Sequence, residues 1–115
     1  MIAKISALIN KRLTDLGIED QSTNQIIKNS PAEISELIKF HDLDYVKALK
    51  KAEEDQNLPD NLKKKFNIGI GNNPIFSEVF SRPATAAKAS IKAVEMIAKK
   101  KAKKILNISG GTHHG

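Results

Sequence analysis

The feature that most restricts the fold is a succession of three segments near the C-terminal end of the chain. Residues 84–100 have helical periodicity, residues 105–108 form a short apolar run, and a glycine-rich loop starts at Ser109. A helix, a buried strand and a glycine loop with polar side chains are together typical of a parallel α/β sheet. Functional sites in such sheets lie beyond the carboxyl ends of the strands. We therefore expect the chemistry of this chain in its last seven residues.

Most of the remaining chain predicts helices. Apolar residues recur at helical spacing over residues 2–16, 31–39 and 42–55. The second of these segments starts with a helix-initiation signal, in which Ser30 is the cap and Glu33 completes a capping box. The helix expected over 84–100 has an apolar stripe formed by Ala87, Ile91, Val94 and Ile97.

Three further segments complete the predicted fold. Residues 24–28 are a second candidate strand, and residues 58–66 are expected to be a polar surface connection because they contain a proline. Glycines and asparagines predict a turn over 69–74, followed by a short helical turn that ends before Arg82 and Pro83. The predicted fold class is α/β: a mostly helical piece of a parallel sheet with one or two short strands, in a single domain over residues 1–115.

Composition excludes several classes of site. The chain contains no cysteine, which rules out disulfides, thiolate zinc sites and a cysteine nucleophile. No stretch approaches the roughly 20 apolar residues that a membrane-spanning helix needs. The first residues contain no apolar run long enough for a signal peptide. We therefore expect a cytoplasmic protein without membrane contact.

The charge of the chain is unevenly distributed. Residues 1–62 carry 8 Lys/Arg against 11 Asp/Glu, whereas residues 63–115 carry 11 against 2. The cluster at 99–104 could meet phosphates, which would make the chain a nucleic-acid- or partner-binding module. No aromatic or arginine side chains are interleaved with these lysines, and a lysine run at a helix end is usually a solvated face. We therefore do not expect nucleic acid to be the partner. A purely structural or regulatory partner is a third alternative.

The chain ends in two adjacent histidines that follow two glycines. Neighbouring imidazoles disfavour each other's protonation, so that one tends to stay neutral and can act as a base. A disordered tail or a remnant of a purification tag is an equally good explanation when the pair is taken alone. A metal site within this chain is not expected, since His41 is the only other histidine and acidic residues are rare after residue 60.

Four sequence blocks considered together resemble one protein family. They are His41-Asp-Leu-Asp-Tyr-Val46, Gly69-Ile-Gly-Asn-Asn-Pro-Ile-Phe76, Arg82-Pro-Ala-Thr-Ala-Ala87 and Asn107-Ile-Ser-Gly-Gly-Thr-His-His-Gly115. In order and spacing they are similar to the zinc-dependent histone deacetylase and acetoin-utilization deacetylase family, which has the arginase-deacetylase fold. The Thr-His-His-Gly ending is most similar to bacterial acetoin-utilization-type members. The resemblance spans the whole chain, and the paired-histidine block is its most specific part.

The resemblance implies hydrolysis of acetyl-lysine or a small acetylated amine by a zinc-activated water. It assigns His114 as the general base and acid and His113 as its electrostatic partner. Gly110 and Gly111 would let the loop pass beneath the acyl tunnel. Asn72 stands where many members have an aspartate that binds the substrate backbone. For Asp44 and Tyr45 in the first block we expect structural roles.

The chain also departs from the family pattern. Members have an opening strand before the first helix, and beyond the paired histidines they carry an Asp-x-His, a further aspartate and a tyrosine. The 115 residues contain none of these features. We therefore expect an interior fragment that binds no zinc, is inactive alone, and self-associates through the uncovered run at 105–108.

Overall fold

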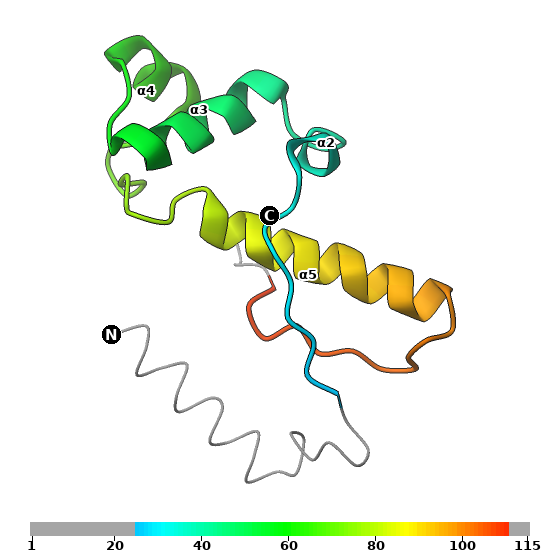
Figure 1. The fold of residues 1–115 in the computed structure, drawn as a ribbon. Helices are drawn as coiled ribbons and strands as arrows, with labels where there is room; N and C mark the ends of the chain where they lie inside the picture. The colour runs from blue at the N-terminus through cyan, green and yellow to red at the C-terminus, as the bar shows by residue number, and fades with distance from the viewer. Residues whose placement is uncertain (1–24, 111–115) are drawn as a thin grey trace, which may run out of the picture.

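The computed structural model of the protein describes residues 25–110 and is mostly helical (Figure 1). Its helices are α2 (Ile34–Leu37), α3 (Leu43–Asp55), α4 (Asp60–Phe66) and α5 (Ser81–Ala98). The helix expected over residues 2–16 lies outside the described residues. None of the helices in the described part is long and apolar enough to cross a membrane.

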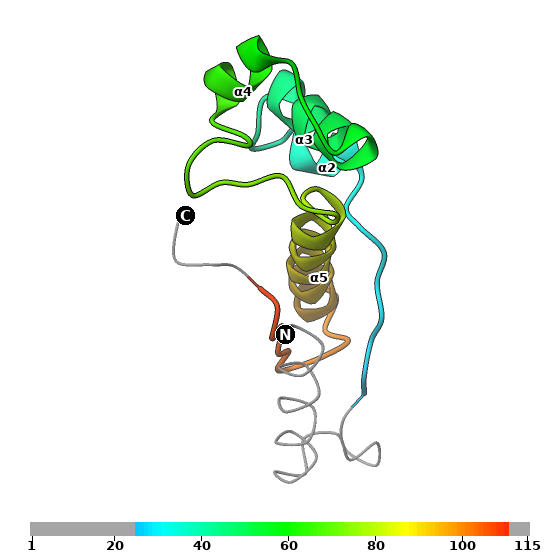
Figure 2. The ribbon, with the colours of Figure 1, turned by 90° about the vertical axis from the view of Figure 1, so that its left-hand side faces the viewer.

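The helices occupy two regions of the molecule. The short helices α2 and α4 lie with α3 at one end of the molecule, and α5 extends away from them (Figures 1 and 2). Two non-helical segments, 25–32 and 103–110, run along α5, and Figure 2 shows α5 between them. Ala32 N–H donates to Ala84 O at 2.9 Å, which joins the first segment to the start of α5.

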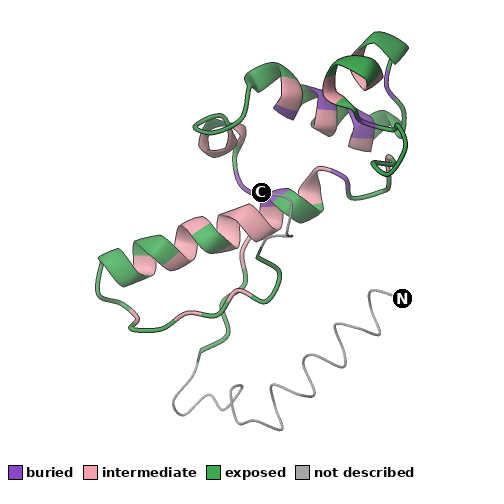
Figure 3. Cartoon of the chain, turned by 180° about the vertical axis from the view of Figure 1, so that it is seen from behind, coloured by how far each residue is buried: buried purple, intermediate pink, exposed green. Residues whose placement is uncertain are grey.

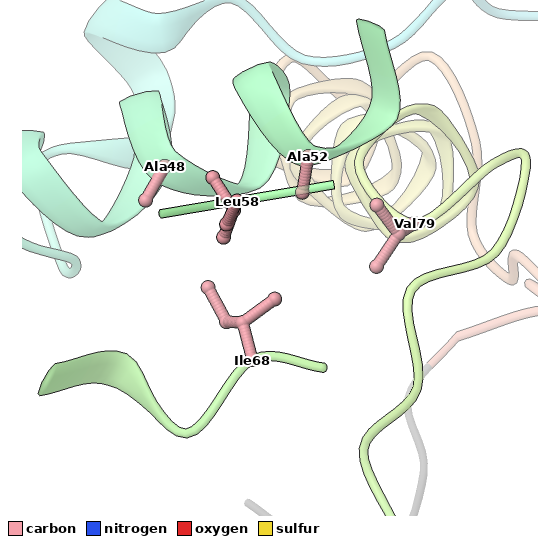
Figure 4. Close-up of a cluster of buried hydrophobic side chains, with 5 residues drawn as sticks. All are labelled: Ala48, Ala52, Leu58, Ile68 and Val79. Carbon is pink, nitrogen blue, oxygen red and sulfur yellow. The ribbon is translucent and has the colours of Figure 1, made fainter. Parts of the chain in front are cut away.

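The core lies under α3, where Ala48 and Ala52 present a face of small side chains (Figure 4). Ile68 and Leu58 pack against this face from the chain on either side of α4, and the side chain of Ile68 is fully buried. Val79 completes the cluster just before α5. The half-buried side chains around it are Tyr45, Leu49, Leu62, Phe66 and Ile75. The well-packed part of the molecule is therefore the α3–α4 end.

Helix α5 is buried only at its beginning (Figure 3). Ala84 is 3% exposed, whereas Val94 is 69% and Ile97 is 48% exposed. The predicted apolar stripe therefore includes two side chains, Val94 and Ile97, that the described residues leave exposed. Periodicity identified the apolar face correctly, but no element among residues 25–110 covers its second half.

Neither expected strand forms in the described residues. Residues 25–28 and 105–108 are extended or irregular, and the β-pairing described is one isolated antiparallel bridge between Ile70 and Asn73. An apolar run becomes a strand only when a neighbour satisfies its backbone hydrogen bonds, and residues 25–110 supply no such neighbour. The mostly helical character is confirmed, whereas the parallel sheet is not seen in this part of the chain.

Two helix predictions need correction. Residues 60–66, expected to be a surface connection, form α4: Pro59 is its N-cap, Asp60 lies in its first turn, and the lysines of its last turn suit the helix dipole. Helix α2 is shorter than the predicted 31–39, and its cap is Glu33 rather than Ser30. The backbone N–H of Glu33 donates to the Glu36 carboxylate at 2.8 Å, so the capping box starts three residues later than expected.

The predictions for α3 and for the turn over 69–74 are confirmed. The start of α5 differs from its prediction, because the turn over 77–80 leads directly into the helix and Pro83 lies within it. A proline is tolerated in the first turn of a helix, where its missing N–H would have no partner within the helix.

Candidate functional site

The structure describes two of the five predicted site residues. Asn72 lies exposed in the turn that precedes α5, and Gly110 is the last described residue. His113, His114 and Gly111 lie outside the described residues. Asn72 and Gly110 belong to separate segments, the turn before α5 and the 103–110 segment after it, and neither lines the groove described below.

The turn that carries Asn72 is held by several short hydrogen bonds. Gly69 N–H donates to Asn73 O at 2.7 Å, and the Asn73 side-chain amide donates to Asn67 O at 2.6 Å. Gly69 and Gly71 adopt φ of 74° and 57°, which side chains rarely allow. The turn therefore holds the Asn72 backbone at a defined place on the surface.

The segment that ends at Gly110 is fixed by Asn107. The side-chain Nδ2 of Asn107 donates to Ala86 O at 3.1 Å and to the Ser90 hydroxyl at 3.0 Å, both on α5. Its Oδ1 accepts from Ser109 N–H at 3.2 Å, which forms an Asx turn. Its backbone carbonyl accepts from Gly110 N–H at 3.3 Å. One side chain thus shapes the turn and ties it to the helix.

A shallow groove of about 400 Å³ lies beside the first half of α5. Its lining residues are Asn29, Glu78, Ser81, Arg82, Thr85, Ala86, Ala89, Asn107 and Ser109. Asn29 donates to Thr85 O at 2.9 Å, so asparagines from the two flanking segments bond adjacent carbonyls of α5. Arg82, in the first turn of α5, forms an ion pair with Glu78 of the turn that precedes the helix.

His41 lies far from this groove in the sequence and has a packing environment of its own. It is exposed and makes ring contacts with Phe40 and Tyr45, whose centroids lie 4.9 Å and 5.5 Å from it. Tyr45 in turn packs on Phe66 beside the core, which agrees with the structural role expected for it. Asp44 is exposed in the first turn of α3.

The described residues do not fit a zinc ion. Within residues 25–110 no three His, Cys, Asp or Glu side chains lie close enough together to hold a metal. A catalytic zinc typically takes three protein ligands and a water. Residues 25–110 therefore do not by themselves gather the ligand set of such a site.

Among residues 25–110, two carboxylates have perturbed pKa values, and both have structural roles. Partial burial raises the pKa of Glu53, but hydrogen bonds from Ser81 and Phe80 outweigh it and lower that pKa overall. The side-chain hydrogen bond from Lys88 lowers the pKa of Glu36, with help from the Glu33 backbone. Glu53 joins the start of α5 to α3, and Glu36 joins α5 to α2.

Sequence reasoning assigned no role to Asn107 or Glu53. The signal for Asn107 was present, since an asparagine followed two and three residues later by serine and glycine favours an Asx turn. Glu53 gave no signal, because it contacts backbone groups 27 and 28 residues away.

Comparison with known families now defines the class of the protein. A model of the histone deacetylase domain matches residues 2–115, and the chain therefore belongs to that family. The match includes the turn with Asn72, the α5 segment and the paired histidines. No curated protein and no solved structure matches the chain.

Proposed function

We propose that this chain supplies the acid–base histidine pair of a cytoplasmic zinc-dependent deacetylase that acts on acetyl-lysine or a small acetylated amine. The observation that carries the proposal is the family match over residues 2–115, a range that includes His113 and His114. These residues follow the turn at Asn107–Gly110, which is hydrogen-bonded to α5. A functional loop needs a fixed support of this kind.

The histidines supply the two proton transfers that amide hydrolysis requires. His114 removes a proton from the attacking water and later returns one to the leaving amine. His113 lies next to it in sequence and acts through its charge, because two adjacent imidazolium ions are disfavoured. A positioned general acid–base contributes roughly 10²–10⁴-fold to the rate.

Asn72 contributes to substrate binding in this proposal. It lies exposed at the tip of a turn fixed by two glycines, and its amide can accept a hydrogen bond from a substrate backbone. Asn brings no charge, in contrast to the aspartate that many members have there. We therefore propose that charged peptide substrates bind more weakly at Asn72 than they would at an aspartate in that position.

The 115 residues alone are proposed to be inactive. The family is zinc-dependent, and residues 25–110 gather no three metal ligands. The paired histidines serve as acid and base rather than as ligands. We therefore propose that ligands outside the described residues hold the metal.

A nucleic-acid function is not proposed. The lysines at 99–104 are exposed at the end of α5, where they suit the negative end of the helix dipole. We expect only weak binding that is indifferent to sequence and falls steeply with salt.

The test compares the 115-residue chain with a longer chain that includes an opening strand and continues past Gly115 through an Asp-x-His segment. We expect no stoichiometric zinc and no deacetylation of an acetyl-lysine peptide for the shorter chain. The longer chain is expected to be active, and His41→Ala serves as a control that leaves its activity unchanged. Zinc-dependent turnover by the 115 residues alone would overturn the proposal.

A further inference from the structure

A small hollow lies between α3 and α4, at the well-packed end of the molecule. The two helices lie side by side (Figures 1 and 2), and the rings of Tyr45 on α3 and Phe66 on α4 have centroids 5.7 Å apart. The hollow has a volume of about 230 Å³ and shares no lining residue with the groove beside α5. Pockets for drug-sized ligands have roughly 300–1,000 Å³, so a ligand of this hollow has to be small.

Part of the lining of the hollow is apolar. Ala48 is buried, and Leu62 and Phe66 are half-buried where they pack against the core. A ligand with an apolar part that covers these side chains gains affinity, because apolar surface on both sides is removed from water.

The charged groups that line the hollow are mainly ammonium groups. Lys47 and Lys51 contribute from α3 and Lys65 from α4, against the single carboxylate of Asp44. Lys51 donates to Asp55 at 2.7 Å, which offsets its charge in part. In the described part of the chain, Lys47 and Lys65 form no ion pair with a carboxylate. The hollow therefore favours a negatively charged ligand.

Lys65 brings positive charge and an aromatic ring together. Its Nζ lies 5.0 Å from the centroid of the Phe66 ring, within the roughly 6 Å of a cation–π contact. An anion that binds this ammonium group therefore lies close to the ring. A ligand whose negative charge stands next to an apolar group matches both features.

We propose that the hollow between α3 and α4 binds a small phosphate monoester that carries an aromatic group. Lys47 and Lys65 bind the phosphate, and Leu62 and Phe66 contact the aromatic group. A phosphate monoester carries about −1.5 to −2 at pH 7, which suits two ammonium groups better than the single charge of a carboxylate. Lysine binds phosphate as a point charge, so no fixed fork geometry is required.

The experiment is an NMR titration of the ¹⁵N-labelled 115-residue chain with phenyl phosphate. Inorganic phosphate and phenol are titrated separately as probes of the charge alone and of the ring alone. We expect phenyl phosphate to produce saturable shifts of the Ala48, Leu62 and Phe66 amide signals. Inorganic phosphate should bind roughly five- to tenfold more weakly, because it makes no apolar contact. Phenol, which has no charge, should produce no saturable shift.

The variants separate the hollow from the general positive charge of the two helices. Lys47→Gln with Lys65→Gln removes two lining charges, whereas Lys50→Gln with Lys64→Gln removes two exposed lysines of the same helices that are not lining residues. Each lining lysine is expected to contribute roughly two- to fivefold to the affinity for phenyl phosphate, as exposed ion pairs do. The control pair should change it less than twofold, and Asp44→Asn should increase it.

Three results would overturn the proposal: no saturable shift with phenyl phosphate, equal losses of affinity in the two double variants, or equal affinities for phenyl phosphate and inorganic phosphate. If the spectrum shows that Lys65→Gln disturbs the fold, Lys47→Gln is compared with Lys50→Gln alone. Equal affinities of these two single variants would also overturn it. The titration measures binding without turnover, so its outcome does not depend on the proposed deacetylation.

Discussion

Replacement of Glu53 by alanine should weaken the connection between α3 and α5. One carboxylate oxygen of Glu53 accepts the backbone N–H groups of Phe80 at 2.9 Å and of Ser81 at 2.8 Å. These N–H groups belong to the start of α5, where no carbonyl of the helix can receive them. Glu53 therefore acts as a helix cap supplied by a distant element.

The expected magnitude follows from these two bonds. Loss of a helix cap costs about 0.5–2 kcal/mol, and hydrogen bonds to a charged group contribute roughly 1.5–3 kcal/mol. Glu53 is half-buried, so water replaces the lost bonds only in part. We expect Glu53→Ala to lower the free energy of unfolding by about 2 kcal/mol, near the top of the range for a cap. The corresponding fall in Tm is roughly 8–16 °C.

The effect should depend on pH in a defined direction. The pKa of Glu53 in the folded chain is below its ordinary value of 4.5, so folding favours the ionised form. Its contribution is therefore complete above about pH 5 and is lost as the pH falls through the folded-state pKa. The difference between Glu53→Ala and the unsubstituted chain is expected to shrink at pH 3.

The assay is urea unfolding followed by circular dichroism at pH 7 and pH 3. Glu54→Ala is the matched control, because Glu54 is the next residue of α3 and is exposed. We expect the control to change stability by less than about 0.5 kcal/mol. Equal stability of the Glu53 and Glu54 variants at pH 7, or a Glu53 effect unchanged by acid, would refute the reasoning.

Three further predictions concern the core, the turn before α5 and the uncovered segment. Ile68 is fully buried, so Ile68→Ala should cost about 2–5 kcal/mol and Ile68→Val about 0.5–1.5 kcal/mol, measured by the same unfolding assay. Gly69→Ala should destabilise more than Gly71→Ala: both have positive φ, but only at Gly69 would a Cβ meet Ile75, at 3.2 Å. Equal losses of stability in Gly69→Ala and Gly71→Ala would refute this steric explanation. Leu106→Lys should reduce self-association of the chain in analytical ultracentrifugation, because Leu106 is 63% exposed; an unchanged association state would show that another surface is responsible.

The parts of the fold that were predicted correctly are those set by local sequence. Helix α3 follows from its apolar spacing, and the turn at 69–74 follows from glycines that adopt positive φ. Helix α4 was missed because Pro59 was taken as a break, although a proline just before a helix is compatible with its start.

The incorrect predictions concern residues whose structure depends on contacts with residues distant in the sequence. An apolar run such as 105–108 is compatible with a strand, but whether it pairs depends on residues elsewhere in the chain. The same limit applies to Val94, whose place on an apolar stripe could be predicted whereas its exposure could not. The histidine pair could be proposed as a site from the sequence alone because its motif is local. Asn107 received no role because its bonds to α5 span 17 and 21 residues.

The paired histidines are proposed to transfer protons and not to bind the metal. The direct test measures zinc content and deacetylation rate together in the longer chain proposed above, with and without His114→Ala. We predict full zinc content with activity lowered by roughly 10²–10⁴-fold. Loss of zinc together with activity would make His114 a ligand, and unchanged activity would remove it from the mechanism; either result contradicts the account.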